Sequence, residues 1–143
     1  MGHAFLHAQT AAELETILEA RVLNCGQAAF FVISSAGITD GGAALGIESE
    51  ADAFTLALNR GWLPKGTAMD ESISLGKLSL LLMKAFDIKG GLFYRLMPSP
   101  RYAFRAMVSQ FYIQEEADPG MKVSGQSFLD ILGRVLNAKG GEI

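Results

Sequence analysis

Histidine and cysteine are almost absent from this chain. Its 143 residues include two histidines, His3 and His7, and a single cysteine, Cys25. A lone cysteine forms no intramolecular disulfide and has no second cysteine with which to hold a metal. Because both histidines lie within the first ten residues, no central histidine is available to activate Cys25 or a serine as a nucleophile. The sequence therefore predicts no catalytic residue, and we expect the protein not to be an enzyme.

Phosphate-binding and calcium-binding motifs are also missing. The glycine-rich segment from residue 37 to 46 is not followed by the Lys-Ser or Lys-Thr pair that a P-loop requires. The acidic residues Glu115, Glu116 and Asp118 lack the alternating ligands and the terminal glutamate of a calcium-binding loop. They are better interpreted as a solvated turn. We therefore predict no metal site and no cofactor.

Long apolar runs are absent as well. The most apolar segment, residues 78 to 83, lies between Lys77 and Lys84, whereas a membrane-spanning helix needs about 18 or more apolar residues. We therefore expect no membrane span. A chain that is 50% hydrophobic and only 19% charged is not intrinsically disordered. Its length suits a single domain with a sizeable core.

Basic residues are scarce at the start of the chain and concentrated in its middle. Residues 1 to 52 contain seven acidic residues and one arginine, a net charge of −6, whereas residues 77 to 105 contain six basic residues and one aspartate, a net charge of +5. This asymmetry favours an anion-attracting end of the domain, although the same charges also suit helix faces that contact only water. The chain as a whole is acidic and carries no nucleic-acid-binding motif, so we expect no nucleic-acid partner.

The segment from Ala53 to Phe86 matches the chain 50 residues later without a gap. It combines an apolar helix, a turn around residues 63 to 66 and a second apolar helix. The second half of this segment also matches, more faintly, the chain 50 residues earlier, and the corresponding positions in the three segments are Leu23-Asn24, Ile73-Ser74 and Val123-Ser124. Such a period indicates supersecondary units that bury their apolar faces against one another. The predicted fold class is all-α, with three helix-turn-helix units of about 50 residues packed into one compact domain.

The domain boundaries follow from this repeat. Residues 1 to 10 are predicted to be a disordered start or the remnant of a signal peptide, since residues 4 to 8 are apolar apart from His7 and end in a small residue. Residues 11 to 143 are predicted to form one domain. Its units span about 11–38, 48–88 and 101–138, with an insert at 89–100. Helices are expected over 10–20, 24–35, 48–60, 75–86, from 101 onwards and over 128–136, and Gly37 is expected to end the second.

Capping residues mark the expected helix starts. The caps are Thr10, which opens a capping-box pattern, together with Asn24, Ser74 and Ser124. Cys25 directly follows a cap, where a thiolate would be stabilised, but a buried structural cysteine is the preferred interpretation. The helix over residues 75 to 86 is apolar around more than half its circumference, so we expect it at the centre of the domain. Phe111 is expected to face inward from the last turn of the third unit's first helix.

Residues 87 to 101 form an irregular insert between the second and third units. Gly90 and Gly91 break the preceding helix, and Pro98 and Pro100 are predicted to prevent a new helix from starting early. The insert nevertheless carries four large apolar residues, Leu92, Phe93, Leu96 and Met97. A free linker would be more polar. The insert therefore either packs on the body of the domain or contacts a partner.

The insert and its flanks also supply the candidate ligand-binding residues, which are Tyr94, Arg95, Arg101, Tyr102 and Arg105. Arginine holds carboxylates and phosphates through two parallel hydrogen bonds, and aromatic faces stack on sugar rings and guanidinium planes. In the alternative interpretation the two tyrosines fill the core. The three arginines then pair with Asp87 or with the acidic first unit. The sequence leaves both interpretations open.

The repeat resembles the S-layer homology repeat. The residues that carry the resemblance are Gly61-Trp62-Leu63-Pro64 with Ile73-Ser74-Leu75-Gly76-Lys77, Phe111-Tyr112-Ile113 with Val123-Ser124-Gly125-Gln126-Ser127, and Leu23-Asn24-Cys25-Gly26-Gln27. The resemblance covers most of residues 11 to 138 and implies a compact, pseudo-threefold helical domain. It also implies an exported protein that binds an anionic cell-wall polymer through an arginine at the helix start. That position holds Cys25, Leu75 and Gly125 in this chain, so the polymer pocket of the family lacks its arginine here.

We therefore expect a non-enzymatic binding or scaffolding module of the bacterial cell envelope. Its partner would be an anionic cell-envelope polymer or a protein, contacted through the insert. The alternative is a small-ligand-binding domain, or a self-associating structural module, with an apolar pocket between helices. Export to the periplasm or the cell surface is expected, while a cytoplasmic location and a homo-oligomeric state stay open.

Overall fold

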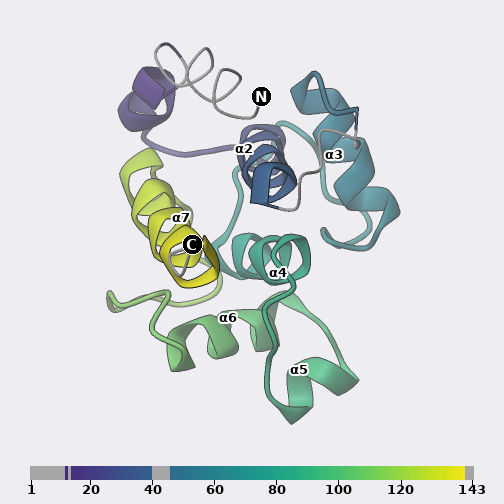
Figure 1. The fold of residues 1–143 in the computed structure, drawn as a ribbon, viewed down its shortest axis with the longest axis vertical. Helices are drawn as coiled ribbons and strands as arrows, with labels where there is room; N and C mark the ends of the chain where they lie inside the picture. Colours follow the sequence, from purple (N-terminus) through teal and green to yellow (C-terminus); the bar gives the residue numbers. More distant parts are fainter. Residues whose placement is uncertain (1–11, 13, 40–45, 141–143) are drawn as a thin grey trace.

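Helix α4 (Leu75–Ala85) lies at the centre of the molecule (Figure 1). All of its residues are buried except Lys77 and Lys84, which are partly exposed. Its one buried hydroxyl, on Ser79, donates to the Leu75 carbonyl at 2.7 Å, so the interior contains no unpaired polar group there. A helix that is apolar on most sides is stable only when neighbours surround it. The central position predicted for residues 75 to 86 is confirmed.

The structure is a computed structural model that describes residues 12, 14–39 and 46–140. After a short helical segment at residues 14–19, its helices are α2 (Cys25–Thr39), α3 (Glu50–Asn59), α4, α5 (Leu92–Leu96), α6 (Pro100–Ser109) and α7 (Gly125–Gly140). Helix α4 packs against both α2 and α6, and α2 also packs against α3. Over the described residues the only β structure is two isolated bridges. The all-α prediction is confirmed.

Side-chain caps start α2, α4 and α7 in the same way. The side-chain oxygens of Asn24, Ser74 and Ser124 each accept a hydrogen bond from the backbone N–H three residues later, at 2.8, 3.1 and 3.1 Å. At the first of these starts Gln27 also accepts from the Asn24 N–H at 3.0 Å, which completes a reciprocal capping box. These bonds satisfy amides that have no partner inside the helix. The three predicted caps are confirmed.

The residues just before these caps meet in the core. Leu23, Ile73 and Val123 are buried, and the Leu23 N–H donates to the Val123 carbonyl at 2.8 Å. The Ile73 N–H in turn donates to the Leu23 carbonyl at 2.9 Å. Buried backbone groups need hydrogen-bond partners, and side-chain packing alone would not supply them. These bonds therefore pair the buried amides and connect three distant chain segments. The starts of α2, α4 and α7 are thereby joined.

Helices α3 and α6 also begin and end in similar ways. Each begins after a serine whose hydroxyl accepts a backbone N–H, Ser49 for α3 and Ser99 for α6. Each is followed by a residue with positive φ, Gly61 at 74° and Phe111 at 69°. After α3, the chain folds back onto the helix at Trp62, because the Trp62 N–H donates to the Ala57 carbonyl at 2.8 Å.

Four details of the sequence analysis are wrong. Gly37 does not end a helix, because α2 continues to Thr39 with Gly37 buried inside it. The prolines do not prevent an early helix, because α5 forms before Pro98 and α6 takes Pro100 into its first turn, where no N–H is needed. Helix α7 extends to Gly140, beyond the expected residue 136. Phe111 does not face inward but is 73% exposed.

Some sequence predictions lie outside the described residues. They concern the disordered or signal-peptide start at residues 1 to 10, the Thr10 capping box and the loop over residues 40 to 45.

Candidate functional site

Tyr94 anchors the insert to the body of the domain. It is the one buried residue of α5, and the Lys84 ammonium lies 5.7 Å from the centre of its ring. Gly90 sits against the same ring, where a β-carbon would come within 2.6 Å of Cδ2, so the close approach requires glycine. Burial, together with the charge of Asp87, raises the pKa of the Tyr94 hydroxyl. Tyr94 is therefore a neutral packing residue that is not presented to an external ligand.

Tyr102 holds α5 against α6. Its ring stacks on that of Phe93 with the centres 5.6 Å apart and the planes inclined by 18°. Tyr102 is half-buried, and its backbone N–H is bound by the Ser99 cap of α6. Offset aromatic stacking of this kind adds to the stabilisation that burial alone provides. Tyr94 and Tyr102 thus give the insert a defined position on the domain.

The three predicted arginines behave differently from the two tyrosines. Arg95 extends from α5, whereas Arg101 and Arg105 lie one helical turn apart on α6, and all three are exposed. No hydrogen bond or ion pair of their guanidinium groups is found within the described residues. The alternative in which these arginines pair with Asp87 is not seen, because Asp87 is bound by Lys89 at 3.1 and 3.2 Å. The arginines are therefore free to bind an external anion.

The apolar residues of the insert mostly face away from the body. Leu92, Phe93, Leu96 and Met97 are 62 to 69% exposed. Because Tyr94 is the one buried residue of α5, the insert both packs on the domain and presents an apolar surface. The unusual apolar content of residues 92 to 97 was the sequence signal for this surface. The sequence did not indicate which side chain of α5 would be buried against the domain, and therefore which ones would remain exposed.

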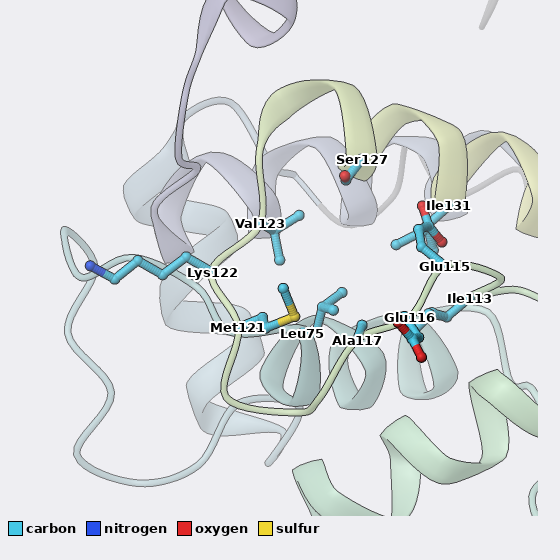
Figure 2. A pocket seen from close by; sticks show the side chains of 10 residues that line it. All are labelled: Leu75, Ile113, Glu115, Glu116, Ala117, Met121, Lys122, Val123, Ser127 and Ile131. Atoms are coloured by element: carbon cyan, nitrogen blue, oxygen red, sulfur yellow. The ribbon is translucent and has the colours of Figure 1, made fainter.

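A small pocket lies on a different side of the molecule, between α4, α7 and the chain that joins α6 to α7 (Figure 2). Its volume is about 80 Å³, and it is lined by Leu75, Ile113, Glu115, Glu116, Ala117, Met121, Lys122, Val123, Ser127 and Ile131. Pockets that bind small organic ligands usually measure roughly 300 to 1,000 Å³. This pocket holds a few water molecules at most. An apolar pocket between helices was an alternative from the sequence, but its position and lining were not predicted, since they depend on which residues the fold brings together.

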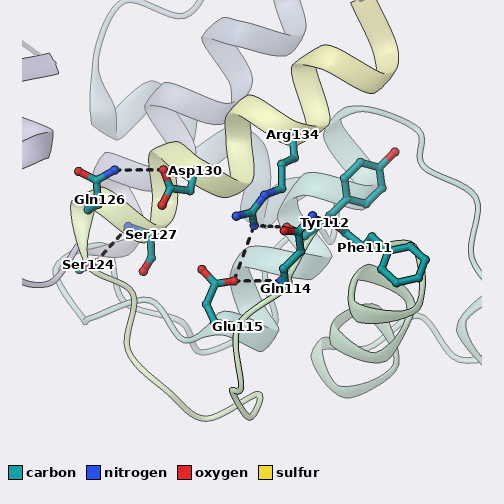
Figure 3. Close-up of polar contacts among 9 residues, drawn as sticks. All are labelled: Phe111, Tyr112, Gln114, Glu115, Ser124, Gln126, Ser127, Asp130 and Arg134. Atoms are coloured by element: carbon teal, nitrogen blue, oxygen red, sulfur yellow. Dashed lines mark hydrogen bonds and ion pairs between the residues drawn. The ribbon is translucent and has the colours of Figure 1, made fainter.

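One of the two carboxylates that line the pocket, that of Glu115, already has a partner in the structure (Figure 3). Glu115 lies 3.6 Å from the Arg134 guanidinium, which also donates to the Tyr112 carbonyl at 2.9 Å. The backbone N–H groups of Glu115 and Gln114, with the charge of Arg134, lower the pKa of the Glu115 carboxyl. Since Arg134 comes from α7, these bonds attach the α6–α7 connection to that helix. We therefore assign Glu115 a structural role in this turn.

Cys25 has the environment of a structural residue. It is fully buried at the first turn of α2, and burial, followed by the charge of Glu71, raises the pKa of its thiol to about 11. A thiol with this pKa is protonated at neutral pH and is a poor nucleophile. The described part of the chain also contains no cluster of three histidine, cysteine, aspartate or glutamate residues arranged to hold a metal. The expectation of a buried structural cysteine is confirmed.

Comparison with known proteins gives no relative. No protein-family model, no curated protein and no solved structure matches this chain. Among the helices of the described residues, none has the length and hydrophobicity required to cross a membrane.

Proposed function

We propose that the chain is a three-unit helical repeat domain similar to the S-layer homology family. Backbone hydrogen bonds that recur 50 residues apart support this proposal. The Cys25 N–H donates to the Glu71 carbonyl at 2.9 Å. Fifty residues later, the Leu75 N–H donates to the Met121 carbonyl at 2.8 Å. Helices α3 and α6 begin 50 residues apart, as do α2, α4 and α7.

We further propose that the domain is a non-enzymatic binding module, exported to the cell envelope. The observation that carries this proposal is the set of three exposed, unpaired arginines on α5 and α6, at Arg95, Arg101 and Arg105. Exposed guanidinium groups bind phosphates and carboxylates through paired hydrogen bonds. The partner is therefore an anionic component of the cell envelope. The protonated thiol of Cys25 supports a role without nucleophilic catalysis.

The binding surface differs from the one that the family resemblance implies. The positions of the family's ligand arginine hold Cys25, Leu75 and Gly125, all of which are buried. The small pocket beside Leu75 offers little room for a polymer or a small organic ligand. We therefore favour the α5–α6 end over the pocket, and a binding module over a small-ligand carrier.

Sedimentation with insoluble cell-wall and membrane fractions tests this function. The protein is compared with the variant Arg95→Ala, Arg101→Ala, Arg105→Ala at low and moderate salt. The matched control is Arg21→Ala, Lys65→Ala, Lys139→Ala, which removes the same charge from three other exposed positions. We expect the parent and the control to sediment, the arginine variant to remain soluble, and salt to weaken binding.

The proposal fails if the folded parent stays in the supernatant at low salt, or if both variants lose binding equally. If protease treatment of the fractions abolishes binding of the parent, the partner is an envelope protein instead. Sedimentation velocity at several concentrations measures self-association directly.

A further inference from the structure

Helix α5 carries an exposed apolar surface, formed by Leu92, Phe93, Leu96 and Met97, which we call the apolar tip. These side chains are 62 to 69% exposed, although each would gain from leaving water. Helical spacing places Leu92, Phe93 and Leu96 on one face of α5, with Met97 directly after its last turn. Contiguous apolar surface of this kind usually marks a contact with a protein or a membrane.

The apolar tip is held in position rather than attached loosely. Tyr94 is buried beneath it, and the Phe93 ring stacks on Tyr102 of α6. At the base of the insert, the Gln110 side chain donates to the Lys89 carbonyl at 2.7 Å. Contacts on both sides therefore fix α5 on the domain. Binding through the tip requires little additional ordering.

The shape of this end is convex. In Figure 1, α5 projects beyond α4 and α6 at the end of the molecule that lies away from α2 and α3. A projecting apolar tip is buried only by a partner surface that has a matching groove or that deforms around it. A lipid bilayer offers such a surface without a preformed groove, because apolar side chains insert among the headgroups and the first acyl carbons.

The charges around the tip match a negatively charged bilayer. Lys89, Arg95 and Arg101 are exposed close to it in sequence, and neither arginine has an ionic partner within the described residues. Residues 77 to 105 carry a net charge of +5, whereas residues 1 to 52 carry −6. An anionic surface therefore attracts the basic α5 end and repels the acidic first segment, residues 1 to 52. This field would orient the molecule before the tip makes contact.

We propose that the apolar tip inserts into the surface of an anionic lipid bilayer, with Arg95 and Arg101 binding the lipid phosphates. This inference rests on the proposed function, because the same arginines hold the anionic partner, and it identifies that partner as a bilayer. Helix α3, whose first turn carries the exposed carboxylates Glu50 and Asp52, lies at the end of the molecule opposite α5 and therefore away from the membrane in this arrangement (Figure 1).

Cosedimentation with lipid vesicles tests the inference on the full chain. Vesicles of phosphatidylcholine with phosphatidylglycerol are compared with vesicles of phosphatidylcholine alone. We expect binding to the anionic vesicles, weakened by salt, and little binding to the neutral ones. Replacing Arg95 and Arg101 by glutamine should weaken binding by roughly fivefold per charge.

A tip variant separates insertion from simple charge attraction. Leu92→Ser, Leu96→Ser, Met97→Ser keeps the Phe93–Tyr102 stack and should weaken binding to anionic vesicles by roughly tenfold or more. The matched control Leu18→Ser, Val22→Ser, Leu136→Ser changes three exposed apolar residues elsewhere and should bind like the parent. As an independent readout, Leu96→Trp in a Trp62→Phe background should show blue-shifted fluorescence on anionic vesicles only.

The inference is overturned if the parent ignores anionic vesicles at low salt, if the tip variant binds as tightly as the parent, or if the Leu96→Trp emission does not shift. Sedimentation with cell-wall material but not with vesicles would overturn the bilayer contact and leave the proposed function standing. Loss of binding to both vesicles and envelope fractions would reject the two proposals together.

Discussion

At the scale of single residues, Phe111 has an unusual backbone conformation for a bulky side chain. Its φ of 69° lies in the left-handed region, which a residue with a β-carbon adopts at a cost. Gly61 holds the same place after α3 with a φ of 74° and without that cost. Phe111 recovers little by packing, because its side chain is mostly exposed. The chain therefore tolerates local strain at the end of α6.

Phe111→Gly is expected to stabilise the protein. Relief of the left-handed strain exceeds the added entropy of the unfolded chain, so the free energy of unfolding should rise by about 0.5 to 1 kcal/mol. Urea unfolding followed by circular dichroism measures this change. Gly61→Ala is the matched control and should lower stability by about 1 kcal/mol, because it introduces the same strain after α3. A destabilised Phe111→Gly would show that the exposed ring makes contacts of greater value than the strain.

Cys25 is expected to make stability depend on pH in the alkaline range. Its pKa rises from 9.0 to about 11 on folding, mainly because the thiolate cannot be buried without cost. Below pH 9 both states are protonated and the full stability is present. Between pH 9 and 11 only the unfolded state loses the proton, so stability should fall by about 3 kcal/mol over this range.

The difference between the parent and Cys25→Ala isolates this effect from other alkaline titrations. Urea unfolding from pH 7 to pH 10.5 should show a steeper loss of stability for the parent than for the variant. Parallel curves for the two proteins would mean that folding does not raise the pKa of the Cys25 thiol.

At the scale of elements, the start of α7 is set by backbone contact. The Gly125 N–H donates to the Ala20 carbonyl at 3.0 Å, and a β-carbon at Gly125 would overlap the Ile17 carbonyl. Helix α7 can therefore approach the segment before α2 only with glycine at this position. Gly133, in the middle of the same helix, has nothing within 4 Å of where its β-carbon would lie.

Alanine at these two glycines should have opposite effects. Gly125→Ala is expected to destabilise the protein by about 3 kcal/mol, because the helix must move away from the Ile17 backbone. Gly133→Ala should stabilise it by up to about 1 kcal/mol, because alanine favours the helix and meets no neighbour. Thermal unfolding of both variants gives the comparison. Similar melting temperatures for the pair would contradict the close packing of α7 on residues 17 to 20.

At the scale of the whole molecule, the core joins parts of the chain that are far apart in sequence. Helix α2 contributes the buried residues Ala28, Ala29, Val32 and Ile33, and the preceding Leu23 bonds to segments near residues 73 and 123. Helix α2 covers both α3 and α4. Removing the first segment therefore exposes apolar surface on two other helices.

A chain of residues 46 to 143 is accordingly expected not to fold cooperatively. Without Leu23 and α2, the buried faces of α3 and α4 contact water and the central backbone bonds lack a partner. Circular dichroism should show a broad thermal transition for this fragment and a sharp one for the full chain. A sharp transition for the fragment would mean that α3 to α7 form an independent domain.

Much of the fold could be predicted from local pattern. The all-α class, the caps at Asn24, Ser74 and Ser124, and the buried central helix follow from residue spacing that acts within a few turns. The arginines were identified from charge clustering, and all three are exposed. The site residues Tyr94 and Tyr102 could not be assigned in this way, because an aromatic residue suits either the core or a surface.

Local sequence patterns were enough to predict the helix starts after Asn24, Ser74 and Ser124, the most apolar helix and the cluster of basic residues, because these properties depend on neighbours along the chain. The packing of the helices, by contrast, buries Tyr94 and leaves Leu92, Phe93, Leu96 and Met97 exposed. It also decided that Phe111 points outward and that Asp87 binds Lys89 and leaves the arginines free. These outcomes depend on how much space the packed helices leave for each side chain, which no local pattern records.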